Sequence, residues 1–258
     1  ALDLGVFGAG LATAIGAVIS MLVMCTHFLS KKCTLRLVPV QNLFKKLGEI
    51  SVTGFSSFFV DVAMGILTVL FNRQIMKYLG SDALAVYATV INISTFVQCC
   101  AYSVGQAAQP ILSTNYGAGN AARIRKTLFL ALGTSMAFAA FWTGLSELAP
   151  GLYIRIFMRP TDAIFAIAPS IIRRYSVSFI LLPVNIFSTY YFQSILRPKD
   201  SFIVSIARGL VVSGLLIFAL PAIFAPDSIW WAMPLTELVT FVYAGFAMRR
   251  DTRALPQN

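Results

Sequence analysis

Residues 201–225 read SFIVSIARGLVVSGLLIFALPAIFA, and Arg208 is the one charged residue in this run. A helix needs about 20 apolar residues to cross the hydrocarbon layer of a bilayer, so a run of this length predicts a transmembrane helix. Six further runs of comparable length, each with at most one charged residue, are residues 4–26, 50–72, 83–107, 127–146, 175–196 and 228–248. The sequence therefore predicts an all-α polytopic membrane protein with seven transmembrane helices.

The composition agrees with a membrane protein and argues against an enzyme or a metal protein. Hydrophobic residues make up 58% of the chain, charged residues only 12%, and the mean hydropathy is +0.78. This composition lies far from that of soluble domains. His27 is the single histidine, and the four cysteines lack the paired spacing of a metal site. No zinc-protease or comparable catalytic motif occurs, so we expect no catalytic residues, no metal and no cofactor.

The basic residues predict the orientation of the chain, because short loops rich in Lys and Arg stay on the cytoplasmic side. One set of alternate loops is clearly richer in them, with its basic residues at 31, 32, 36, 45, 46, 123, 125, 126, 197, 199, 249, 250 and 253. We therefore expect a multi-pass protein of the plasma (cytoplasmic) membrane with a cytoplasmic C-terminus. A net charge of +10 arranged in this way favours anionic lipid head groups as partners and not nucleic acid, although topogenesis alone also explains it.

Two segments predict how the spans are grouped. Residues 30–49 are the longest basic and least apolar stretch, and the Phe44–Leu47 pattern is typical of a helix at the membrane interface. We expect a transmembrane helix within residues 1–30, a basic cytoplasmic linker at 31–50, a six-helix bundle at 51–248 and a cytoplasmic tail at 249–258. The uncharged run 83–122 is too long for one span, so we expect it to break at Pro110 and at residues 115–120.

Three charged side chains fall within the predicted spans and are the first candidates for function. Asp61 and Glu237 lie near the middle of their runs, and Arg208 lies nearer the cytoplasmic end of its own. A charge at that depth costs at least about 2.5 kcal/mol, so each must face a cavity or a partner. Asp61 is predicted to be an ion- or substrate-coupling carboxylate or else a structural carboxyl group. Arg208 either pairs with Glu237 or extends toward the membrane surface.

Polar residues on other spans form a candidate lining for a substrate cavity. They are Tyr102, Gln106 and Gln109 on the third span and Asn185 and Gln193 on the fifth, to which Arg208 and Glu237 are added. Aromatic rings and amides of this kind suit lipophilic cations, although each residue singly can equally join neighbouring helices. Pro183 is expected to kink the fifth span and to free backbone carbonyls for a cation.

Three segments resemble the multidrug and toxic compound extrusion (MATE) family. They are residues 109–119, QPILSTNYGAG; residues 175–193, which contain PVNIF at 183–187; and residues 229–237, IWWAMPLTE. The resemblance implies twelve helices in two bundles, with these seven spans corresponding to helices six to twelve. Asp61 would then lie in the seventh helix, where family members often carry a cation-coupling carboxylate. The carboxylate that some members carry in the tenth helix is absent, and Asn185 is the polar residue assigned to ion coupling there.

The resemblance also implies a function, which is secondary active efflux of amphipathic cationic drugs or metabolites in exchange for inward H⁺ or Na⁺. The chain opens at Ala1 without an initiator Met, so we expect it to be part of a longer protein that supplies the missing N-terminal helices. Two alternatives stay open: a lipid-linked oligosaccharide flippase of the same superfamily, which would need a strongly basic cavity, and a seven-helix membrane receptor.

Overall fold

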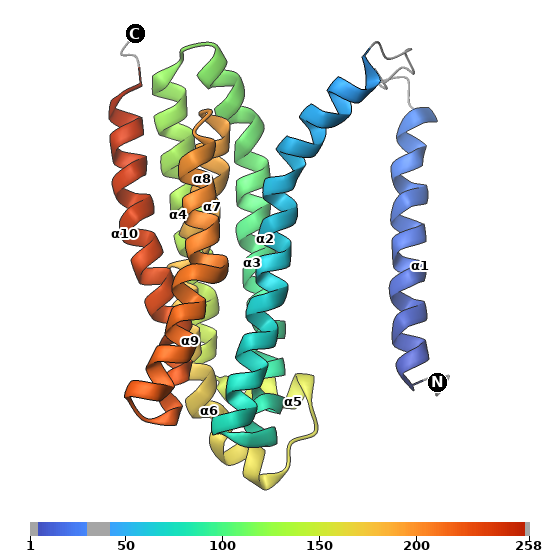
Figure 1. Ribbon diagram of the computed structural model, residues 1–258, viewed down its shortest axis with the longest axis vertical. Coiled ribbons are helices and arrows are strands. Elements are labelled where there is room, and N and C mark those ends of the chain that lie inside the picture. The colour runs from blue at the N-terminus through green and yellow to red at the C-terminus, as the bar shows by residue number, and fades with distance from the viewer. Residues whose placement is uncertain (1–4, 30–41, 256–258) are drawn as a thin grey trace. The chain divides into compact units, whose positions relative to one another are not determined.

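The computed structural model describes residues 5–29 and 42–255, with the backbone alone at 5, 6, 9, 29 and 49–61. These residues form helices joined by short turns, with no strand among them (Figure 1). In chain order the helices are α1 (Gly5–Cys25), η1 (Thr26–Leu29), α2 (Leu43–Tyr78), α3 (Gly80–Gly117), α4 (Ala121–Leu148), α5 (Pro150–Phe157), α6 (Asp162–Ser176), η2 (Val177–Ile180), α7 (Leu182–Ser194), α8 (Pro198–Ile206), η3 (Ala207–Val211), α9 (Val212–Ile223), η4 (Pro226–Trp231) and α10 (Ala232–Arg253). Segment η3 is a π-helix, and the other η segments are 3-10 helices.

The described chain supports the predicted membrane spans. Six helical segments are long and apolar enough to cross a bilayer, namely Gly10–Phe28, Gly80–Gly117, Ala121–Leu148, Asp162–Ser194, Pro198–Ile223 and Pro226–Arg253. Six of the seven expected spans lie within or largely within these segments. The remaining one, residues 50–72, falls on α2, where the side chains of 49–61 are not described. Residues 30–41, which hold most of the predicted linker, lie outside the described residues.

The chain divides into two compact units, Ala1–Ser51 and Val52–Asn258. In the second unit, α3 packs on α4, α6 and α7, and α10 packs on α7 and α9. The C-terminal end of α10 and the turn between α3 and α4 lie at one end of this bundle, and α5 and the start of α6 lie at the other (Figure 1). The predicted basic residues near 123 and 250 therefore lie at one end, and Arg197 lies there too, 3.9 Å from Asp251, as alternating spans require.

Two apolar clusters fill the second unit, and on α10 a layer of buried polar side chains that includes Glu237 lies between them. One cluster contains Ile186 and Met233, and the other contains Phe187 and Ala244. On α10, Glu237 lies between Met233 of the first cluster and Ala244 of the second. On α7, Asn185 directly precedes the two cluster residues. The charged and amide side chains of the predicted site therefore lie in the middle of the bundle, with apolar packing on both sides.

The predicted break in the run 83–122 is confirmed within residues 115–120, but the part of the prediction that placed it at Pro110 was wrong. Helix α3 continues through Pro110 to Gly117, and the chain turns only at residues 118–120, where Gly119 has a φ of 70°. Asn120 then caps α4, because its side-chain oxygen accepts a hydrogen bond from the backbone N–H of Arg123 at 3.1 Å. A proline removes one backbone hydrogen bond, but packing on both sides of it can hold the helix together. Ala108 and Leu112 are buried and supply that packing.

Helix α6 begins at Asp162, well before the predicted start of the span at residue 175. The predicted span 175–196 leaves Arg173 and Arg174 outside it, in the loop that precedes it. Both lie instead in the last turn of α6 and have partners. The Arg173 Nε donates to the backbone oxygen of Glu147 at 3.0 Å, and Arg174 pairs with Asp227 at 3.2 Å. These contacts give both guanidinium groups a hydrogen-bond or ion-pair partner, so the two arginines are accommodated within a helix.

Candidate functional site

Asn185 and Arg208 lie at departures from regular α-helical geometry, and Glu237 lies in the second turn after one. The 3-10 segment η2 and a turn at Leu181 precede α7, and Asn185 is in the first turn of α7. Arg208 lies in η3, a π-helical segment within the sixth span. Glu237 follows η4, a 3-10 segment at the start of the last span. Because π-helical turns occur frequently at functional sites, this coincidence marks the layer as a candidate site.

The Pro183 kink that the sequence predicts corresponds to the η2–α7 break. Proline is tolerated in the first turn of a helix, where its missing N–H would have no partner in any case. Pro183 occupies that place at the start of α7. The backbone N–H of Asn185 donates to the oxygen of Leu181 at 3.0 Å, so the new helix starts at the break. The break therefore sets the direction in which Asn185 enters the core.

The three side chains form one closed cluster. The Nε of Arg208 donates to Oε1 of Glu237 at 2.6 Å. The Nδ2 of Asn185 donates to Oε2 of Glu237 at 2.7 Å and to the Glu237 backbone oxygen at 2.8 Å. Glu237 and Asn185 have no exposed surface, and the Arg208 side chain is 13% exposed. Of the two alternatives for Arg208, the structure shows the ion pair.

This arrangement neutralises the two charges within the layer. Taking an ion out of water costs several kcal/mol, and a partner with good geometry and further hydrogen bonds offsets that cost. Short charge-assisted bonds of this kind are about twice as strong as neutral ones. Each carboxylate oxygen of Glu237 accepts one such bond, from Arg208 or from Asn185. In this conformation the Glu237 carboxylate is already paired and is not available as a free negative charge for a cation.

Asn185 retains one unused polar atom. Both bonds that its amide donates go to Glu237, while its Oδ1 is buried and has no hydrogen-bond partner among the described residues. Leaving a buried acceptor unpaired costs about 1–3 kcal/mol, so such atoms need an explanation. A carbonyl-type oxygen beside a carboxylate can accept a hydrogen bond or contact a small cation.

Gln109 and Gln193 are also brought together, but in a separate place. The Nε2 of Gln109 donates to Oε1 of Gln193 at 3.4 Å, and the Nε2 of Gln193 donates to the Ser201 hydroxyl at 3.3 Å. Gln193 lies eight residues after Asn185 on α7, which is about 12 Å along the helix. The structure therefore divides the predicted lining into two groups. The central cluster is Asn185, Arg208 and Glu237, and the second group, Gln109 and Gln193, lies nearer the end of the bundle at which α10 ends.

Tyr102, Gln106 and Gln109 share one face of α3, because they are spaced by four and three residues. Tyr102 and Gln106 are exposed and Gln109 is half-buried. The Tyr102 ring meets the edge of Tyr190 from α7, with ring centroids 6.4 Å apart. Gly105 makes this approach possible, since a Cβ at that position would overlap the Tyr190 ring.

Asp61 lies on α2, but its side chain is outside the described part of the structure. Its backbone position agrees with a place in the second predicted span. Its contacts, and hence its role, stay a prediction.

Sequence reasoning missed a second charged network that joins α8 to α10 at the C-terminal end of the bundle. Arg250 donates from Nη2 to Asp200 at 3.0 Å and from Nε to Asp251 at 2.8 Å. The Tyr243 hydroxyl donates to Asp200 at 2.7 Å, and Arg197 lies 3.9 Å from Asp251. The prediction of orientation used only the basic residues of this end, without the carboxylates. The signal was present in Asp200 and Asp251, two carboxylates that lie close to basic residues in the sequence.

The comparisons with known proteins agree with this architecture. The family model MatE matches residues 57–218. The multidrug export protein MepA of Staphylococcus saprophyticus is 24% identical over 239 residues, which cover 92% of this chain and 52% of that protein. The chain thus spans about half the length of the curated relatives it matches.

Solved structures show the same fold. An outward-facing multidrug resistance MATE family transporter of the MOP superfamily superposes with a TM-score of 0.85 at 19% identity, over 98% of this chain and 58% of that one. The MATE multidrug transporter DinF-BH gives a TM-score of 0.77 at 26% identity, over 97% of this chain and 56% of that one. These likenesses confirm the resemblance found in the sequence. Because the family match covers more than half of the residues, this chain belongs to the MATE family of membrane transporters.

Proposed function

We propose that this chain is the C-terminal part of a secondary exporter in the plasma membrane, which exchanges amphipathic cations for inward H⁺ or Na⁺. It acts as a transporter and not as an enzyme, works together with N-terminal helices of the same protein, and has its C-terminus in the cytoplasm. The observation that carries the proposal is the family match, because residues 57–218 include Asp61, Asn185 and Arg208. Export of drugs by MepA proteins supports the substrate class.

The coupling step is assigned to Asp61. A carboxylate deep in a helix bundle favours one positive partner at a time, so a proton or Na⁺ and a cationic substrate compete for it. Glu237 is a poor candidate for the same role, because Arg208 already neutralises it. Protonation of Glu237 would leave Arg208 as an unpaired charge that is only 13% exposed. We therefore assign a structural role to the Glu237–Arg208 pair within the proposed substrate cavity.

Asn185 is assigned to the ion path through its unpartnered Oδ1. The amide holds the Glu237 carboxylate from one side, and the oxygen at its other end is free to accept a proton donor or a small cation. The break before α7 supports this assignment, because irregular backbone within a membrane is tolerated mainly where it is buried in protein or lines a cavity.

The substrate face is assigned to α3 and α7. Tyr102 and Gln106 are exposed on α3, and Tyr190 stands beside Tyr102. Ring faces attract lipophilic cations by about 0.5–2 kcal/mol each, and amide oxygens add favourable dipoles. Gln109 and Gln193 extend this face toward the C-terminal end. The polar atoms of this surface would meet the opposite wall of the cavity, which the N-terminal helices supply.

The ion pair also bears on the flippase alternative. A carrier of anionic lipid-linked sugars needs net positive charge in its cavity. Arg208 is the one basic residue within the predicted spans of the sequence, and Glu237 neutralises it. This observation favours cationic over anionic substrates.

The proposal is tested with the protein expressed from its complete reading frame and reconstituted in liposomes. We expect uptake or release of a fluorescent lipophilic cation, such as ethidium, only when an H⁺ or Na⁺ gradient is imposed. A gradient-independent signal equal to that of empty liposomes would overturn the proposal. The Asp82→Asn variant serves as a control, because Asp82 is exposed in the first turn of α3 and its neutralisation should leave transport unchanged.

A further inference from the structure

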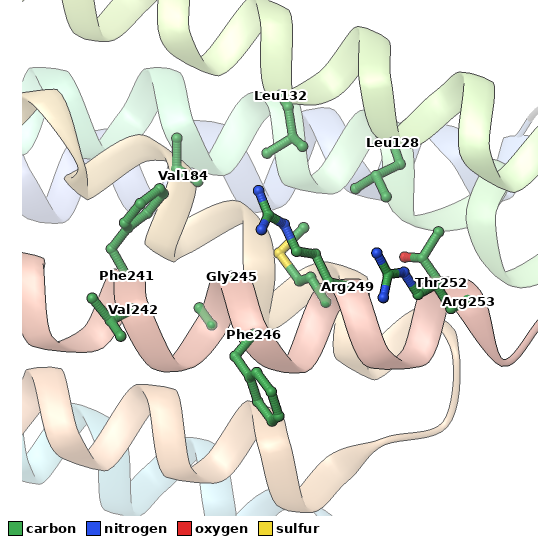
Figure 2. A pocket seen from close by; sticks show the side chains of 12 residues that line it. Leu128, Leu132, Val184, Phe241, Val242, Gly245, Phe246, Arg249, Thr252 and Arg253 are labelled. Carbon is green, nitrogen blue, oxygen red and sulfur yellow. The ribbon is translucent and has the colours of Figure 1, made fainter.

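A groove of about 630 Å³ lies on the second unit between α4 and α10, closed at its base by the start of α7. Its walls are apolar and include Leu128 and Leu132 on α4 and Phe246 on α10. Figure 2 shows Arg249 extending from α10 toward Val184 and Leu132, and Arg253 nearer Leu128 at the end of the groove. The groove therefore has apolar walls and two guanidinium groups in the half that lies nearer the C-terminus of α10.

The charges of Arg249 and Arg253 are not neutralised by a neighbouring carboxylate in the described part of the chain. Their neighbour Arg250 is held by Asp200 and Asp251. Neither Arg249 nor Arg253 forms an ion pair with any side chain in the described ranges, and both are exposed. Arg125 on α4 adds a third positive charge on the same side, because it lies three residues before Leu128 on one helix face.

The groove is long enough for a headgroup and most of one acyl chain. From Phe241 to Arg253 it follows twelve residues of α10, about 18 Å at 1.5 Å per residue, of which the apolar stretch from Phe241 to Met248 takes about 10 Å. One leaflet contributes about 15 Å of hydrocarbon, which is half of the roughly 30 Å core. With the arginines at the end of the helix that leaves the bilayer, the apolar part lies at the depth of the acyl chains of that leaflet.

We propose that this groove binds an anionic phospholipid, with one acyl chain between α4 and α10 and the phosphate at Arg249 and Arg253. Guanidinium groups bind phosphate oxygens through two parallel hydrogen bonds, which gives a headgroup site its geometry as well as its charge. Basic pockets between transmembrane helices bind such headgroups. The proposal does not depend on transport, because it concerns binding at the outer surface of the bundle.

The charge of the site is tested by native mass spectrometry of the detergent-solubilised complete protein with phosphatidylglycerol or phosphatidylcholine. We expect wild-type protein to retain phosphatidylglycerol in preference. The Arg249→Gln/Arg253→Gln variant should weaken that binding about 30-fold, since each basic residue near the surface contributes about 1 kcal/mol, or about fivefold. Arg123→Gln removes an exposed charge at the same end outside the groove lining and should have little effect. Equal retention of the two lipids would overturn the proposal.

The apolar part is tested by filling it without changing charge. A Cβ added at Gly245 meets open space, so Gly245→Leu places its side chain in the groove and should reduce lipid retention at least tenfold. Gly133→Leu is the matched control, because Gly133 is also open but lies on α4 outside the lining. Unchanged retention in Gly245→Leu would show that the lipid binds elsewhere. If Val242→Cys forms disulfide-linked dimers in membranes, a second copy covers the groove, and the proposal is equally overturned.

Discussion

The ion pair between Arg208 and Glu237 gives the sharpest prediction about the core. Glu237→Gln keeps the shape of the side chain but has one oxygen in place of two, so it loses the negative charge and can accept from Asn185 or from Arg208 but not from both. Arg208 then becomes a buried cation without its partner. Removing one member of a buried pair typically costs about 3–5 kcal/mol. Because the Arg208 side chain keeps 13% exposure and can shift toward water, we expect the lower end, about 3 kcal/mol.

The matched variants separate charge from packing. Arg208→Met should also destabilise the protein by about 3 kcal/mol, because it leaves the fully buried Glu237 unpaired. The double variant removes both charges and should recover most of the loss, to within about 1–2 kcal/mol of wild type. Asp227→Asn breaks the exposed pair with Arg174, whose side chains are 60% and 38% exposed, and should cost less than about 1 kcal/mol.

The assay is thermal unfolding of the complete protein in detergent, followed by intrinsic fluorescence. A loss of 3 kcal/mol corresponds to a fall in Tm of roughly 6–12 °C for a domain of this size. The reasoning is refuted if Glu237→Gln melts within 2 °C of wild type and yet abolishes transport. That result would show that the carboxylate is a working charge in transport and that its pairing with Arg208 contributes little to stability.

Three further predictions follow from single contacts. Gly105→Ala should push the Tyr190 ring away from α3 and weaken the binding of a lipophilic cation several-fold, as measured by fluorescence polarisation, whereas equal affinity would remove this face from the substrate site. Asn185→Leu deletes two hydrogen bonds to Glu237 and should lower stability by about 2–3 kcal/mol in the same thermal assay; no change would mean that Arg208 alone holds the carboxylate. Tyr243→Phe removes the bond to Asp200 and should cost about 1–2 kcal/mol, and a larger loss would indicate that the whole α8–α10 network depends on that hydroxyl.

The sequence was sufficient for the helical class and most of the spans, because the apolar runs are long and the bilayer thickness fixes their minimum length. It was less reliable for the ends of helices. Helix α6 begins well before the predicted span at 175–196, because Arg173 and Arg174 find partners, the Glu147 backbone and Asp227, that are distant in the sequence. Pro110 was expected to break a helix that packing keeps continuous.

In the candidate site too, properties that depend on the local sequence could be predicted, and contacts between residues far apart in the chain could not. The depth of Glu237 and Arg208 could be predicted by counting residues, and so could the possibility that they pair. Asn185 was predicted as a site residue, but its hydrogen bonds to Glu237 could not be predicted, because they depend on the turn before α7 that directs the amide at Glu237. The network of Asp200 and Arg250 was missed for a related reason, since its residues lie on two helices separated by 50 positions in the chain.

The exchange mechanism is tested most directly by comparing two transport modes in proteoliposomes that contain the complete protein with Asp61→Asn. One mode is efflux of a lipophilic cation driven by an H⁺ or Na⁺ gradient, and the other is exchange of labelled for unlabelled substrate without any gradient. We predict that gradient-driven efflux is lost while exchange persists only at higher substrate concentrations, because the variant keeps the aromatic and amide face but lacks the carboxylate for which the ion and the substrate compete. Gradient-driven efflux at the wild-type rate would contradict the assignment of Asp61 as the coupling group.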